Sequence, residues 1–207
     1  MQGLLIGIDR LSALAGKTAG WAIVALTGVI CYEVFARYAF RAPTSWAYDT
    51  SYMLYGLLFM LAGAYALSRG GHVRADFLYR SLSPRGQAVI DLPLYLLFFV
   101  PGIAALIWFG WDFFWLSFLQ NERSSVTADG PLIWPFKFLI PLAGALMLLQ
   151  GVAEIIRCVI ALRTGRWPDK LADVEEMETK ALALAAQQAA AEAQARGQDG
   201  PRAEARR

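Results

Sequence analysis

Four long apolar stretches constrain the fold of this chain more than any other feature of its sequence. They fall at about residues 18–38, 48–68, 88–118 and 133–162. An α-helix rises about 1.5 Å per residue, so about 20 apolar residues cover the roughly 30 Å hydrocarbon core of a bilayer. Inside lipid each backbone amide and carbonyl needs a partner within its own segment, which favours helices over open strands. The sequence therefore predicts an all-α integral membrane bundle of four transmembrane helices.

The composition agrees with residence in a lipid bilayer. Apolar residues make up 57% of the chain, and seven tryptophans and eight tyrosines can anchor the helices at the membrane interfaces. Residues 1–168 carry 13 basic and 9 acidic side chains, whereas residues 169–207 carry 6 and 8. A nucleic-acid partner is excluded, because such a partner needs a concentrated basic stripe on a water-facing surface.

Basic residues in the short connections predict the orientation. Nine lie on one predicted side and four on the other, and the side richer in Lys and Arg is the cytoplasmic one. The nine are Arg10, Lys17, Arg69, Arg74, Arg80, Arg85, Arg157, Arg163 and Arg166, and the four are Arg37, Arg41, Arg123 and Lys137. We therefore expect both termini in the cytoplasm of a bacterium and the helices in its inner membrane.

Two further helices are expected outside the four spans. Residues 72–82 place apolar side chains on one helical face, so a short interfacial helix is predicted between the second and third spans. Residues 169–207 are rich in Ala, Glu and Gln and predict a polar cytoplasmic helical tail, frayed at its end. The predicted domains are thus a membrane part, 1–168, and this tail. Pro93 and Pro101 predict a tilted or kinked third span.

Charged residues within the spans admit a local interpretation. Glu33 and Arg37 are spaced i, i+4, and Glu154 and Arg157 are spaced i, i+3, so each couple predicts an ion pair on one helix face. Asp112 is interpreted as a solvated residue near a membrane interface, where a carboxylate costs less than at the midplane.

The sequence offers little chemistry for catalysis. It has one histidine, His72, and neither a Walker A loop nor a dinucleotide-binding fingerprint. We therefore predict no catalytic residue, no metal and no cofactor. A carrier usually shows internal repeats and broken helices, which this chain does not show convincingly. These features favour an accessory membrane subunit and leave two alternatives open: a membrane anchor or subunit of an integral membrane redox enzyme, and a small oligomeric channel.

Several motifs in a fixed order resemble one family. They run from Glu33-Val-Phe-Ala-Arg37-Tyr38, followed by Pro43 and Trp46, through Gly63-Ala-Tyr65, His72-Val-Arg74 and Asp76, Leu82-Ser-Pro84, Glu122 and Ser124, Trp134-Pro135 with Lys137, and Pro141, to Leu148-Leu-Gln150-Gly151. The set spans roughly residues 28–157. It resembles the DctQ-type small membrane subunit of tripartite ATP-independent periplasmic (TRAP) transporters. One departure is Asp49, where members of that family often have Glu.

The resemblance implies partners and a role. Such a subunit braces a large DctM-type permease subunit, and a periplasmic solute-binding protein delivers an organic acid or related solute for sodium-coupled uptake. It also implies a set of partner-contact residues at the two membrane faces. These candidates are Glu33, Arg37, Arg41, Trp46, Asp49, His72, Arg74, Asp76, Glu122, Trp134, Lys137 and Gln150.

Overall fold

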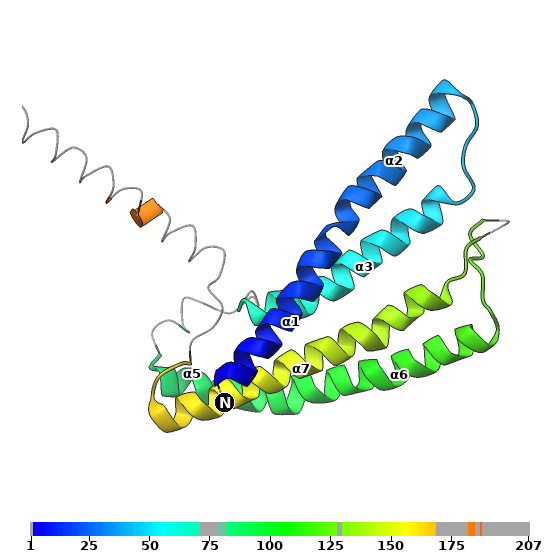
Figure 1. Cartoon of the computed structure of the whole chain (residues 1–207). Coiled ribbons are helices and arrows are strands. Elements are labelled where there is room, and N and C mark those ends of the chain that lie inside the picture. The colour runs from blue at the N-terminus through cyan, green and yellow to red at the C-terminus, as the bar shows by residue number, and fades with distance from the viewer. Residues whose placement is uncertain are drawn as a thin grey trace, which may run out of the picture. The chain divides into compact units, whose positions relative to one another are not determined.

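The computed structural model describes residues 2–70, 79, 82–127, 130–168, 182–184 and 187. The chain divides into two compact units, Met1–Leu171 and Ala172–Arg207. The first unit is built of helices (Figure 1), namely α1 (Gln2–Gly20), α2 (Ala22–Ala39), α3 (Ala47–Ser68), α5 (Pro84–Leu94), the π-helical η1 (Tyr95–Phe99), α6 (Val100–Leu119) and α7 (Trp134–Thr164). The predicted interfacial helix and most of the predicted tail lie outside the described residues.

Four helical stretches are long and apolar enough to cross a membrane, which confirms the predicted all-α membrane bundle. They are Gln2–Ala39, Ala47–Ser68, Pro84–Leu119 and Trp134–Thr164. The first begins at Gln2 and not near residue 18, and a turn at Trp21 separates α1 from α2. Asp9 and Arg10 lower the apolar character of α1 in the sequence. In the structure Asp9 is fully buried, so its charge lies inside the helix bundle and away from lipid.

The third span changes its hydrogen-bond register between its two prolines. Ser83 caps the start of α5 by accepting a hydrogen bond from Gly86 N at 3.3 Å, and Pro84 follows it. Pro101 has no amide hydrogen to donate, so regular helical bonding would leave a carbonyl without a partner. In the π-helical turn Tyr95–Phe99 the hydrogen bonds shift by one residue, and the Val100 N–H bonds to Tyr95 O. The helix is therefore locally widened between the two prolines.

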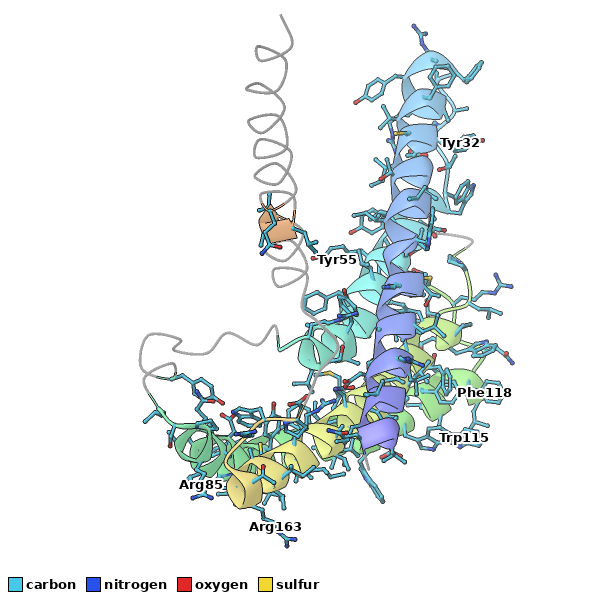
Figure 2. All side chains as sticks on the ribbon, turned by 60° about the vertical axis from the view of Figure 1, so that its left-hand side comes forward. Tyr32, Tyr55, Arg85, Trp115, Phe118 and Arg163 are labelled. Atoms are coloured by element: carbon cyan, nitrogen blue, oxygen red, sulfur yellow. The ribbon has the colours of Figure 1, made fainter. Side chains whose placement is uncertain are left out.

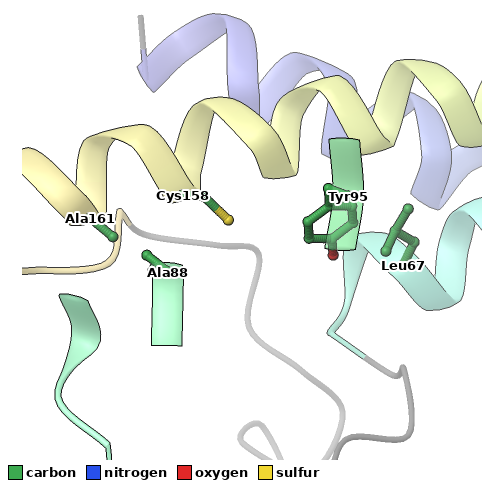
Figure 3. Close-up of a cluster of buried hydrophobic side chains, with 5 residues drawn as sticks. All are labelled: Leu67, Ala88, Tyr95, Cys158 and Ala161. Carbon is green, nitrogen blue, oxygen red and sulfur yellow. The ribbon is translucent and has the colours of Figure 1, made fainter. Parts of the chain in front are cut away.

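Helix α7 lies at the centre of the first unit and contacts α1, α3, α5 and α6. Small residues permit the close approach. A Cβ on Gly144 would lie 2.8 Å from Ile107 of α6, and one on Gly110 would lie 2.7 Å from Ile140 of α7. An apolar core forms where α3, α5, η1 and α7 meet (Figure 3), made of Leu67, Ala88, Tyr95, Cys158 and Ala161.

The first unit has two ends that differ in content (Figure 1). The α2–α3 and α6–α7 connections lie at one, here called the loop end. The start of α1, helix α5 and the end of α7 lie at the other, here called the terminal end. Arg85 and Arg163 both lie at the terminal end (Figure 2). Two of the basic residues assigned to one membrane side therefore share one end of the bundle.

Candidate functional site

A buried polar cluster joins α1 to α7 in the half of the bundle nearer the terminal end. We call it the Asp9 cluster; its members are Asp9 and Ser12 of α1 and Gln150, Glu154 and Arg157 of α7, and all are buried. The guanidinium of Arg157 donates to Asp9 Oδ2 at 2.5 Å and to Glu154 Oε1 at 2.6 Å. Gln150 Nε2 donates to Asp9 Oδ1 at 2.9 Å. The hydroxyl of Ser12 donates to Gln150 Oε1 at 2.8 Å.

The Asp9 cluster orients α1 on α7. A guanidinium out of water costs several kcal/mol unless carboxylates and hydrogen bonds compensate it. Arg157 receives this compensation from two carboxylates, one on its own helix and one on α1. The predicted pair Glu154–Arg157 is present. The sequence did not predict the second carboxylate bound by Arg157, that of Asp9, because Asp9 lies 148 residues away in the chain. Gln150, expected to contact a partner protein, is fully buried and forms hydrogen bonds with Ser12 and Asp9 within the chain.

A second buried carboxylate ties the loop end together. Asp49 stands in the first turn of α3 and is fully buried. It accepts hydrogen bonds from the hydroxyls of Ser124 and Thr127, both at 2.6 Å, which attach the α6–α7 connection to α3. Gly130 packs against Ser124 so closely that a Cβ would lie 2.4 Å from its carbonyl oxygen. The Asp49 carboxylate and the close Gly130–Ser124 contact thus hold this connection in place.

The α2–α3 connection is held by Glu33. The predicted ion pair between Glu33 and Arg37 is present. The other carboxylate oxygen of Glu33 accepts from the backbone N–H of Thr44 at 2.9 Å and from the Thr44 hydroxyl. Glu33 therefore closes the turn that brings the chain back to α3, while half of the Arg37 side chain stays exposed.

Glu122 and Lys137 form an ion pair across the α6–α7 connection. The hydrogen bond from Lys137 holds the pKa of Glu122 below its usual value. The ammonium of Lys137 also lies 3.9 Å from the centroid of the Phe113 ring. Lys137 is buried, so the ion pair fixes the start of α7. The Glu122 side chain stays partly exposed.

The remaining described candidates are aromatic or exposed. Trp46 is exposed and stacks on Tyr32 at 5.9 Å between centroids. The rings of Trp134 and Phe118 pack nearly perpendicular to each other, with 5.2 Å between their centroids. Arg41 is exposed and has a left-handed backbone, with φ of 54°. His72, Arg74 and Asp76 lie outside the described residues. The structure thus places the outer candidates Glu33, Arg37, Arg41, Trp46, Asp49, Glu122, Trp134 and Lys137 at the loop end, and Gln150 in the Asp9 cluster.

An apolar cavity of about 510 Å³ lies between α3, α6 and α7. Its lining residues include Phe59, Gly63, Leu106, Ala143 and Met147. No charged side chain lines it, so it offers no counter-charge to an anionic solute. Among the residues that the structure describes, no group of three or more His, Cys, Asp and Glu side chains is placed to hold a metal ion.

Comparison with known families matches residues 26–161 to "Tripartite ATP-independent periplasmic transporters, DctQ component". The chain belongs to the DctQ family. The predicted resemblance is thereby confirmed over most of the membrane unit. No curated protein matches the chain.

As a DctQ protein, this chain is a component of a TRAP transporter and a multi-pass membrane protein. The matched segment begins within α2 and ends within α7, so it contains Gln150, Glu154 and Arg157 but neither Asp9 nor Ser12. The α1 half of the Asp9 cluster therefore lies outside the DctQ match. Only the tertiary contacts reveal that half, because no local spacing links α1 to α7.

Proposed function

We propose that this chain is the small membrane subunit of a sodium-coupled, binding-protein-dependent transporter for an organic acid or related solute. In this role it braces a large DctM-type permease subunit in the bacterial inner membrane. The DctQ match over residues 26–161 carries the proposal, because membership of that family makes the chain a TRAP transporter component.

The internal bonding supports a bracing role. The Asp9 cluster fixes α1 to α7, and Asp49 fixes α3 to the α6–α7 connection. These charged groups are occupied within the chain, which suits a rigid support better than a solute pathway. A fixed frame of this kind lets a mobile part of the large subunit move while its neighbours stay in place.

The loop end supports a second proposed role, docking of the periplasmic solute-binding protein. Arg41, Trp46 and half of the Arg37 side chain are exposed there. Cationic and aromatic side chains of this kind are frequent in protein interfaces. With both termini in the cytoplasm, this end would face the periplasm.

Transport in proteoliposomes tests the proposal. The chain, the DctM-type subunit and the binding protein encoded with it are purified, and uptake of radiolabelled organic acids is measured with and without an inward sodium gradient. We expect uptake only when all three proteins and the gradient are present. Full uptake after omission of this chain would contradict the bracing role, and uptake by this chain alone would indicate a channel or carrier.

A further inference from the structure

Asp112 is an exposed carboxylate within the apolar helix α6. It is the only charged residue between Asp91 and Glu122. It precedes the end of α6 at Leu119 by seven residues, about 10 Å along the helix axis. The residues beyond it, from Phe113 to Leu119, are almost all apolar. An aspartate side chain is too short to reach water over two helical turns, whereas the long side chains of Lys and Arg can.

Within the described part of the chain nothing neutralises this carboxylate. No hydrogen bond or ion pair reaches the Asp112 carboxylate from any described residue. The ammonium of Lys137, which lies over the ring of the neighbouring Phe113, is paired with Glu122. A carboxylate exposed to lipid within an apolar span is costly, and such groups in membrane proteins usually face a protein or water.

The surface around Asp112 has the composition of an interface. Trp108, Trp111 and Trp115 are 71%, 49% and 47% exposed, and Trp115 projects from α6 with Phe118 in Figure 2. A hollow of about 440 Å³ opens beside them, lined by Ala104, Ile107, Trp108, Trp111, Asp112 and Leu148. Asp112 is its only charged group. Exposed tryptophans beside a hollow are typical of the residues that dominate binding energy in protein interfaces.

We propose that this face of α6, the Asp112 face, binds a transmembrane segment of the large DctM-type subunit, which inserts a basic side chain beside Asp112. The inference rests on the proposed function and adds to it the surface and the charge of the partner. An arginine fits best, because its guanidinium can form two hydrogen bonds with one carboxylate and stack on tryptophan. Pairing of the two charges removes the cost that each would have in lipid.

Co-purification with the tagged DctM-type subunit in mild detergent tests this surface. The variants are Asp112→Leu, Asp112→Asn and Asp112→Glu. Removal of one partner of a buried charge pair weakens binding strongly, so we expect roughly tenfold lower recovery for Leu and Asn and near wild-type recovery for Glu. Thr27→Leu on the exposed face of α2 is the matched control, since the Thr27 hydroxyl bonds only to its own helix carbonyl, Ile23 O.

The thermal stability of each variant alone separates binding from folding. Because the Asp112 side chain makes no hydrogen bond or ion pair within the described chain, Asp112→Leu is expected to be at least as stable as the wild type. Wild-type recovery of the DctM-type subunit by Asp112→Leu would overturn the inference and leave the proposed function intact. Failure of the wild-type chain to retain that subunit would overturn both.

A photocrosslinking amino acid at Trp108 supplies a second readout. We expect an adduct with the DctM-type subunit from this position. Adducts with lipid alone, in membranes where the wild-type complex forms, would assign the Asp112 face to the bilayer and overturn the inference.

Discussion

Arg157 shows how a single side chain can be both costly and useful in this protein. Its guanidinium is fully buried, and its charge is balanced by Asp9 and Glu154. Buried ion pairs of this kind add little net stability over apolar residues, but they penalise every arrangement in which the partners separate. The cluster therefore contributes chiefly to the placement of α1.

Replacement of Arg157 tests this balance. Arg157→Met leaves two carboxylates buried without a cation, so we expect a loss of about 3–5 kcal/mol of stability. Thermal unfolding of the purified protein in detergent measures it.

A matched variant distinguishes charge from packing. Arg157→Met combined with Asp9→Asn and Glu154→Gln removes all three charges, and we expect it to recover much of the loss. Equal or greater destabilisation of the triple variant would contradict the charge-balance explanation.

Glu122 predicts a pH dependence at the loop end. Lys137 lowers the pKa of Glu122 in the folded protein, so the pair stabilises the fold above the unfolded pKa. This contribution is lost as the pH falls through the lowered folded value. We therefore expect the stability difference between wild type and Glu122→Gln to be constant near neutral pH and to disappear in acid. Thermal unfolding across a pH series measures it, and a difference that grows in acid would contradict the pairing.

At the scale of the helices, small residues decide how closely neighbours approach. Gly16 of α1 packs directly on α3, where an added Cβ would lie 2.4 Å from the Cβ of Tyr65. The Tyr65 Cβ is attached to its backbone, so no side-chain rotation can relieve the clash. The spacing of α1 and α3 thus depends on a missing methyl group.

Gly16→Ala should accordingly push α1 away from α3. We expect destabilisation of about 1–3 kcal/mol, which is typical of overpacking. Gly7→Ala is the matched control, since Gly7 lies in the same helix with no heavy atom within 4 Å of an added Cβ. There the better helix propensity of alanine should stabilise by up to about 1 kcal/mol. Equal effects of the two changes on thermal stability would exclude a contact-specific cause.

For the whole membrane unit, the Asp9 cluster and the hydrogen bonds of Asp49 stabilise different ends of the bundle. The Asp9 cluster lies toward the terminal end, and Asp49 holds the loop end. Between them the helices meet through glycines and apolar side chains. The expected orientation places the terminal end in the cytoplasm, because most of the basic residues in the short connections belong to that side.

Cysteine labelling tests this orientation. In a variant with Cys31→Ser and Cys158→Ser, a single cysteine replaces either Arg41 at the loop end or Arg166 after α7; both positions are exposed. We expect a membrane-impermeant maleimide to label Arg41→Cys in spheroplasts, and Arg166→Cys only after permeabilisation. The reverse pattern would place the termini outside.

The helical spans and local pairs were accessible from the sequence, because they depend on residues that are close along the chain. Apolar length predicted the four spans, and spacings of three and four residues predicted the pairs Glu154–Arg157 and Glu33–Arg37. The motif order predicted the DctQ family.

Contacts between distant segments were decided only by the tertiary structure. Arg157 pairs with Asp9, which lies 148 residues away in the sequence. Asp49, predicted to contact a partner, instead accepts hydrogen bonds from Ser124 and Thr127, which lie 75 and 78 residues away. The solvated position of Asp112 near a membrane interface stays a prediction, and the structure adds that its exposed surroundings are apolar. The energy of a charge depends on its neighbours in space, and those neighbours lie far away in the chain.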